Sequence, residues 1–296
     1  MPTLENDGKP RPVGVIIWVL LILGLYSLLP SLVLSIVVQI DMVTNTNLEV
    51  GQNWFEEFKA FNRHYFPLIL AFSSVAQFLF FAFLPIVFYP KFHGRSVVHS
   101  FSLRLGSIWG PLLGFFAGLT LVPLASWLGE FWFWLFPSLR KLVELFGYEG
   151  NITSDPKMIG FYVFAIGMTP AICEEILFRG YLQGTLQRVW KPHTAILFSS
   201  IFFALIHQNA FGITTLLLVG LYLGWLFYRF QSLAATAAFH FAYNTTIVLV
   251  GMTDFFPGIW DELGNFNVWV TVGATVVWIV ISIAIYHLTQ KQREET

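Results

Sequence analysis

Eight long apolar segments run through the sequence and leave few ways for the chain to fold. Most of them reach the roughly 20 residues that a helix needs to cross the hydrocarbon core of a bilayer. Backbone polar groups in that core must be hydrogen-bonded within the chain, which favours helices. The sequence therefore predicts an all-α, polytopic membrane helical bundle of about eight transmembrane helices. The predicted spans are residues 13–40, 66–89, 108–129, 156–187, 194–210, 213–229, 232–252 and 267–288.

The composition agrees with a membrane protein. Hydrophobic residues make up 56% of the 296 residues and charged residues 11%, whereas a soluble domain carries roughly 25% charged residues. The net charge of −1 provides no strongly basic surface for a nucleic acid, so the lipid bilayer is the partner that we expect. The one cysteine, Cys173, excludes an internal disulfide and a CxxC motif. We expect a single integral membrane domain over residues 1–296.

Lysine and arginine residues are unevenly distributed between the predicted loops. With the N-terminus inside, ten of them fall in cytoplasmic segments and five in external ones. Positive charge favours the cytoplasmic side of a membrane, so both termini are predicted to be cytoplasmic. No small-residue cleavage site follows the first apolar run, so we expect this run to be retained as a span.

Two segments depart from the pattern of plain spans. The span at 194–210 is interrupted by the polar run His207-Gln208-Asn209, so its outer end is expected to unwind. Residues 130–155 begin with the aromatic cluster Phe131–Trp134 and continue with mixed polarity, which predicts an interfacial helix. Residues 108–154 would then hold the third span and this interfacial segment.

Glycine and proline residues mark helix starts and helix contacts. Pro156 suits the first position of the fourth span, with Ser154 or Asp155 as its cap. Glycines also recur at intervals of four in the third and sixth spans, where a missing side chain lets helix backbones approach. The glycines that predict such close packing are Gly110, Gly114, Gly118, Gly220 and Gly224.

The fourth predicted span contains a cluster of charged residues. Glu174, Glu175 and Arg179 lie within six consecutive positions, and each charge near the middle of a span costs about 2.5–3.5 kcal/mol on insertion scales. Arg179 follows Glu175 by four residues, so these two can form an ion pair on one helix face. Glu174 is rotated by about 100° from Glu175, which leaves it free for a functional role.

Few other strongly polar side chains fall inside the predicted spans. His207 and His240 are the histidines that lie away from the cytoplasmic ends of their spans, and Asn244 follows His240 on the same helical face. With a rise of about 1.5 Å per residue, Glu174 and His207 each lie roughly 21 Å from the cytoplasmic end of their spans. His240 lies about 13 Å deep and Asn244 about 19 Å. These depths overlap, so we expect the side chains to share one site.

A carboxylate, two histidines and an amide suit water-activated hydrolysis of a peptide bond. Glu174 is a candidate general base, and His207 can share or orient the attacking water. His240 and Asn244 can donate hydrogen bonds to the oxyanion that forms on the scissile carbonyl. A zinc ion on Glu174, His207 and His240 is the alternative, but the H-E-x-x-H signature is absent from the sequence. We expect no cofactor. Cys173 immediately precedes Glu174 and points elsewhere, which disfavours a thiol mechanism.

Three short motifs carry a family resemblance. They are Glu174-Glu175-x-x-x-Arg179, Phe203-x-x-x-His207 and His240-x-x-x-Asn244. In this order, each in a predicted span, they resemble the motifs of the CPBP family of CAAX proteases and bacteriocin-processing enzymes, also called the Abi family. The resemblance covers residues 155–250 and marks them as a catalytic core.

The resemblance implies an intramembrane endopeptidase with an eight-helix fold and a peptide or membrane-protein substrate. In such an enzyme Glu174 and His207 would activate water, and His240 and Asn244 would stabilise the oxyanion. Glu175 and Arg179 would be supporting residues. The family has been described as metal-dependent and is now more often viewed as glutamate proteases without a metal. A bacterial cell membrane is the expected location.

Two other functions fit the same residues. A proton-coupled transporter could use Glu174, His207 and His240 as a relay, although the sequence shows no matching interrupted helices in its two halves. A non-proteolytic immunity protein is the other alternative, because some members of the family are linked to bacteriocin self-immunity.

Overall fold

The computed structural model describes residues 11–44, 54–93, 107–137, 155–209, 212–252 and 266–294, and these are almost entirely helical. Seven helical stretches in this part of the chain are long and apolar enough to cross a membrane, which confirms the all-α, polytopic bundle. The elements are α1 (Pro12–Thr44), α2 (Trp54–Gln77), η1 (Phe78–Phe83), α3 (Leu84–His93), α5 (Trp109–Leu135), η2 (Pro156–Met158), α7 (Ile159–Tyr162), η3 (Val163–Met168), α8 (Thr169–Glu174), η4 (Glu175–Gln183), α9 (Gly184–Leu186), α10 (Pro192–Ile206), α11 (Ile213–Phe230), α12 (Leu233–Met252) and α13 (Val268–Glu294).

Helix α10 accounts for the difference between seven spans and the predicted eight. It is apolar but has 15 residues, so it is about 22 Å long against a hydrocarbon core of about 30 Å. It ends at Ile206, directly before the polar run that was expected to interrupt it, and Gln208 adopts the left-handed conformation with φ 50°. The predicted interruption is therefore confirmed.

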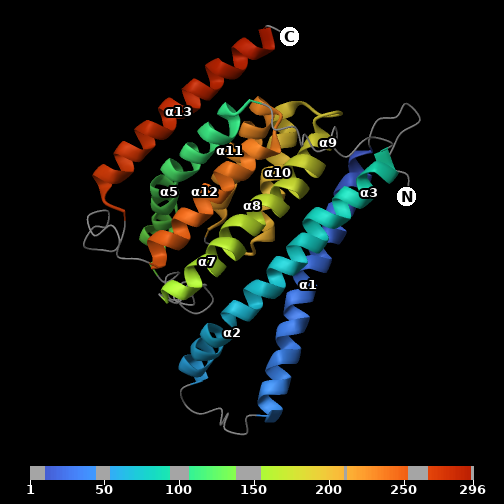
Figure 1. Ribbon diagram of the computed structural model, residues 1–296, viewed down its shortest axis with the longest axis vertical. Coiled ribbons are helices and arrows are strands. Elements are labelled where there is room, and N and C mark those ends of the chain that lie inside the picture. Colours follow the sequence, from blue (N-terminus) through green and yellow to red (C-terminus); the bar gives the residue numbers. More distant parts are fainter. Residues whose placement is uncertain are drawn as a thin grey trace.

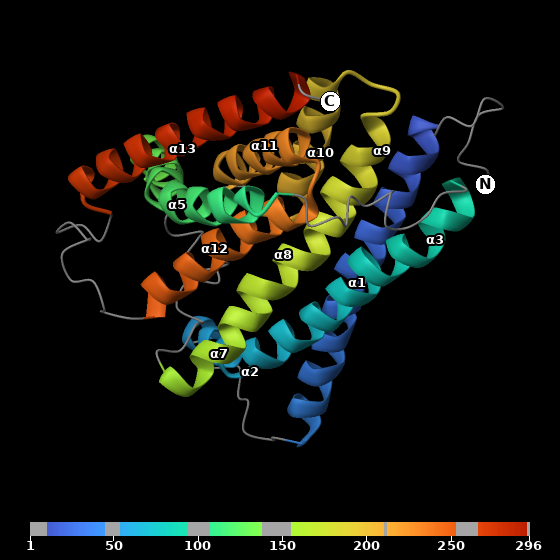
Figure 2. The same ribbon diagram turned by 45° about the horizontal axis from the view of Figure 1, so that its top comes forward.

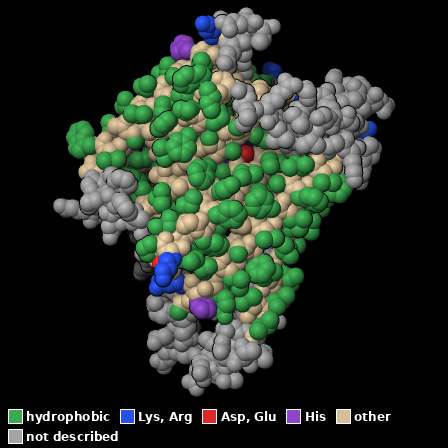
Figure 3. All heavy atoms as spheres, in the orientation of Figure 1, with side chains coloured by type: hydrophobic (Ala, Val, Ile, Leu, Met, Phe, Trp, Pro, Cys, Tyr) green, Lys and Arg blue, Asp and Glu red, His purple; other side chains and the backbone are tan. Residues whose placement is uncertain are grey.

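The continuous helix from α7 to α9 forms the centre of the molecule. It lies between the pair formed by α1 with α2–α3 and the group formed by α5, α11 and α12 (Figures 1 and 2). In its spanning stretch, Pro156–Leu186, 61% of the residues are buried, whereas only 6% of the residues are buried in the spanning stretch of the peripheral helix α13. Hydrophobic side chains cover most of the visible outer face (Figure 3), as expected of a surface in contact with lipid.

Glycines bring α5 and α12 into backbone contact. A Cβ atom on Gly114 would lie 2.3 Å from the Ala235 carbonyl oxygen, and one on Gly118 would lie 2.3 Å from that of Phe239. Neither position can carry a side chain at this helix spacing. The predicted role of these glycines in close packing is confirmed. Because His240 directly follows Phe239, this backbone contact also fixes the depth of His240 in the bundle.

The fourth span begins at the predicted cap, whereas the third span is longer than predicted. The Asp155 side chain accepts a hydrogen bond from the Lys157 amide, and Pro156 occupies the first turn, which confirms the predicted cap. Helix α5 continues to Leu135, so the aromatic cluster Phe131–Trp134 forms its last turns and does not begin a separate interfacial helix. The remainder of the predicted interfacial segment, residues 138–154, lies outside the described residues.

Candidate functional site

Glu174 and Glu175 stand at the junction of α8 and η4 and point to different neighbours. The Oε1 atom of Glu175 lies 3.1 Å from Nη1 of Arg179, and both side chains are almost completely buried. The predicted ion pair is therefore present. The segment η4 is a π-helix, a wide helical turn that is frequent at functional sites. No pattern in the sequence predicts it.

Glu174 faces two histidines that come from other helices. Its Oε2 atom lies 3.9 Å from Nε2 of His207 and 4.0 Å from Nε2 of His240. These distances are too long for direct hydrogen bonds and suit one small molecule or substrate atom between the groups. Glu174 Oε2 is buried and has no hydrogen-bond partner among the described residues.

The position of His207 follows from the end of α10. The last carbonyls of a helix lack an intrahelical partner, and the Phe203 carbonyl accepts a hydrogen bond from Nδ1 of His207 at 2.7 Å. A carbonyl can only accept, so the proton lies on Nδ1. When His207 is neutral, Nε2 presents a lone pair toward Glu174. The His207 side chain is 30% exposed, whereas those of Glu174 and His240 are 7% and 2% exposed, so the site opens beside His207.

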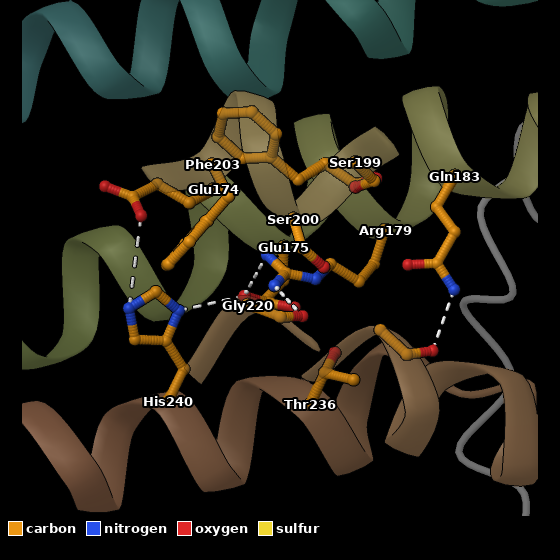
Figure 4. Close-up of polar contacts among 12 residues, drawn as sticks. Glu174, Glu175, Arg179, Gln183, Ser199, Ser200, Phe203, Gly220, Thr236 and His240 are labelled. Atoms are coloured by element: carbon orange, nitrogen blue, oxygen red, sulfur yellow. Dashed lines mark hydrogen bonds and ion pairs between the residues drawn. The ribbon is translucent and has the colours of Figure 1, made fainter. Parts of the chain in front are cut away.

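His240 lies between the two carboxylates, as Figure 4 shows. Its Nδ1 atom is 2.9 Å from Oε1 of Glu175, the same oxygen that accepts from Arg179. The Glu175 carboxylate accepts from both, so His240 donates through Nδ1 and turns Nε2 toward Glu174. Arg179, Glu175 and His240 thus form one buried hydrogen-bonded chain that fixes the ring.

Asn244 is anchored differently from the other candidates. Its Nδ2 atom donates to the Ile166 carbonyl at 2.9 Å. Ile166 lies in the π-helix η3, so this hydrogen bond ties α12 to the helix that carries the carboxylates. Asn244 follows His240 by one turn, about 6 Å along α12. The Asn244 amide therefore hydrogen-bonds the Ile166 carbonyl, and not the carboxylates or the histidines.

Phe203 occupies a central place that the sequence interpretation did not assign. Its ring is buried and lies 4.9 Å from the His207 ring and 5.7 Å from the His240 ring, measured between centroids. The Arg179 guanidinium carbon is 4.5 Å from the centre of the same ring. The signal in the sequence is the four-residue spacing to His207, which places both side chains on one helical face.

Two side chains of η4 attach the site helix to α11. Arg179 donates through Nη2 to the Gly220 carbonyl at 3.1 Å, and Gln183 donates through Nε2 to the Gly224 carbonyl at 2.8 Å. A Cβ on Gly224 would lie 2.9 Å from the Gln183 oxygen, so the glycine gives the amide access to the helix backbone. Gln183 was also missed in the sequence, although it continues the four-residue spacing from Glu175.

The donor set resembles a zinc site in its chemistry and differs from one in its spacing. Each histidine donates its Nδ1 proton to an oxygen, as metal-bound histidines do. Ligand atoms of a tetrahedral zinc with bonds of about 2.0–2.2 Å stand roughly 3.4 Å apart, whereas Glu174 Oε2 is 3.9 and 4.0 Å from the two nitrogens. In the described part of the chain, no three His, Cys, Asp or Glu side chains are placed to hold a metal.

Comparison with known proteins gives one match. Residues 156–246 match the model of a family described as type II CAAX prenyl endopeptidase Rce1-like. This confirms the resemblance carried by the three motifs, and the matched range contains all the candidate site residues. The chain shows no significant match to a curated protein or to a solved structure.

Proposed function

We propose, taking residues 156–246 as the catalytic segment of an Rce1-like CAAX prenyl endopeptidase, that this membrane protease hydrolyses peptide bonds with water activated by Glu174 and His207. One observation carries the proposal. The Glu174 carboxylate and two imidazole nitrogens converge to 3.9 and 4.0 Å in a buried setting, although they come from three helices.

The water-activating step follows from the hydrogen-bonding capacity of the two groups. Glu174 Oε2 and neutral His207 Nε2 are both acceptors, so a molecule that bridges them must donate twice, as water does. A water oxygen about 2.8 Å from each acceptor subtends an angle of about 90° at this separation, close to the angle between its two O–H bonds. When the oxygen attacks the scissile carbonyl, Glu174 takes one proton as general base, and it returns this proton to the amine nitrogen when the C–N bond breaks.

His240 and Asn244 are the proposed oxyanion donors. With both nitrogens protonated, His240 donates through Nδ1 to Glu175 and through Nε2 to the oxyanion. Two carboxylates, the Arg179 guanidinium and this imidazolium then sum to zero charge, which favours a buried cluster. An amide nitrogen carries two N–H groups. One N–H of Asn244 donates to the Ile166 carbonyl, so its second N–H can donate to the substrate oxyanion.

We propose that the reaction needs no metal. The wide spacing of Glu174, His207 and His240 supports this, as does the capacity of these residues to activate water directly. Purified enzyme dialysed against a strong chelator is expected to keep its activity. Loss of activity on chelation and recovery with zinc would overturn this part of the proposal.

The decisive test replaces Glu174 with glutamine, which keeps its shape and removes its basicity. A prenylated peptide with a C-terminal CAAX sequence is the first probe, used with purified protein in vesicles. The change is expected to lower kcat by roughly 10²–10⁴-fold with little effect on folding. Glu130→Gln is the matched control, because Glu130 lies in α5 outside the charged cluster.

A second assay does not depend on the choice of peptide. Membrane proteomes of cells with wild-type protein and with the Glu174→Gln variant should differ in the processing of at least one membrane protein. Full activity of Glu174→Gln on a substrate that wild type cleaves would contradict the assignment of the general base.

A further inference from the structure

Polar residues recur every four positions along the helix that carries the carboxylates. They are Glu175, Arg179, Gln183 and Gln187. The first three are at most 1% exposed, and Gln187 is half-buried at the end of α9. This polar stripe leads from the buried site to the end of the helix, among neighbours that are mostly apolar.

Each residue of the polar stripe has one buried polar atom that no described protein group pairs. These atoms are Glu175 Oε2, Arg179 Nε, Gln183 Oε1 and Gln187 Nε2, and Glu174 Oε2 stands at the inner end. They make up five of the ten such atoms in the described part of the chain. Unpaired buried polar atoms are costly, so their concentration along one stripe is typical of a site that holds a small polar ligand.

The hydrogen bonds that the stripe does make leave these atoms in fixed positions. Gln183 donates to the Gly224 carbonyl through its nitrogen, which turns its oxygen toward Arg179 (Figure 4). The two terminal nitrogens of Arg179 donate to the Glu175 carboxylate and to the Gly220 carbonyl. Its Nε atom has no hydrogen-bond partner among the described residues. From Glu175 to Gln187 the unpaired atoms therefore alternate between acceptor and donor.

We propose that the polar stripe binds a file of water molecules that leads from Gln187 to Glu174. The residues from Glu175 to Gln183 lie in the π-helix η4, where residues four apart are near neighbours on one face, and a water with two hydrogen bonds of about 2.9 Å at a bent angle joins atoms about 4.7 Å apart. Water also donates and accepts, so one molecule fits between each acceptor and the next donor.

The role of this water rests on the proposed hydrolytic function, whereas its binding does not. Each catalytic cycle consumes one water at Glu174. The exposed edge of the site is at His207, where a peptide must enter, so a bound peptide covers that route. The stripe reaches Glu174 along its own helix and can deliver water while the substrate is bound.

Hydration can be measured without substrate by X-ray radiolytic footprinting, in which hydroxyl radicals from bound water label adjacent side chains. Leu182 and Leu186 are fully buried beside the stripe, and Leu121 is equally buried in α5. We expect Leu182 and Leu186 to be labelled more strongly than Leu121, and we expect this labelling to fall in the Gln183→Leu variant. Equal labelling of all three leucines would overturn the proposal, whether or not the protein proves to be a protease.

The supply role is tested by kinetics on any substrate that the wild type cleaves. Gln183→Leu and Gln187→Leu are each expected to lower kcat about five- to tenfold with KM unchanged. Gln77→Leu is the matched control, because Gln77 also has one amide hydrogen bond and one unpaired oxygen, on another helix. Unchanged kcat in Gln187→Leu, with labelling of Leu186 abolished, would refute delivery along the stripe.

Discussion

Gly118→Ala should disturb the site from a distance, and the structure sets the size of the effect. The added Cβ would lie 2.3 Å from the Phe239 carbonyl oxygen, and ordinary contact begins at 3.4 Å, so α5 and α12 must separate by about 1 Å. His240 follows Phe239 on α12 and holds its Nε2 at 4.0 Å from Glu174. A misplacement of about 1 Å at a catalytic group costs about 10²-fold in rate. We expect kcat to fall about a hundredfold and the free energy of unfolding to fall by about 1–3 kcal/mol.

The assay is kcat on the prenylated peptide together with thermal unfolding in detergent. Gly160→Ala is the control, since a Cβ there has no atom within 4 Å among the neighbours described, and it should leave kcat unchanged. If Gly118→Ala retained wild-type kcat and wild-type stability, the backbone contact between α5 and α12 would not set the position of His240, and the reasoning would be refuted.

Two further predictions concern the neighbours of the catalytic groups. Glu175→Gln is expected to lower the free energy of unfolding by about 3–5 kcal/mol, because it leaves the buried Arg179 without its anion. Glu174→Gln breaks no direct hydrogen bond of the Oε2 atom, so it should leave the free energy of unfolding nearly unchanged. Equal unfolding temperatures of the two variants would contradict this difference. Phe203→Leu should lower kcat about tenfold by releasing the rings of His207 and His240 and the face of Arg179. Phe178→Leu, at a buried phenylalanine that packs on Phe203, is the control, and equal rates in both variants would argue against a positioning role.

The depth of each polar group could be predicted from the sequence because a helix rises by a constant amount per residue. Counting from the span ends placed Glu174, His207 and His240 at overlapping levels, and the structure brings these three together. The four-residue spacing likewise predicted the pair of Glu175 with Arg179. Both inferences use distances within one helix, which local geometry fixes.

Contacts that depend on the rotation and spacing of neighbouring helices could not be predicted in this way. Asn244 shares a face with His240, yet its amide donates to the Ile166 carbonyl on the neighbouring helix. Phe203 touches three site residues because Gly220 leaves room for its ring, and a Cβ there would lie 3.2 Å from it. The aromatic cluster was wrongly assigned to a separate helix, because composition does not show that α5 continues to Leu135.

The early end of α10 is what fixes the proton on His207, and Gln208 makes this testable. Gln208 has φ 50°, a conformation that costs a non-glycine residue roughly 1–2 kcal/mol and that glycine adopts freely. Gln208→Gly and Gln208→Val both remove the amide contact to Ser27, so they differ chiefly in backbone preference.

We expect Gln208→Gly to keep wild-type kcat. The branched side chain of valine resists the left-handed turn, so Gln208→Val should shift the end of α10, pull His207 from the Phe203 carbonyl and lower kcat about tenfold. Equal kcat in the glycine and valine variants would show that the helix end does not control the orientation of His207. The water-activating geometry would then have to rest on the ring contact with Phe203 alone.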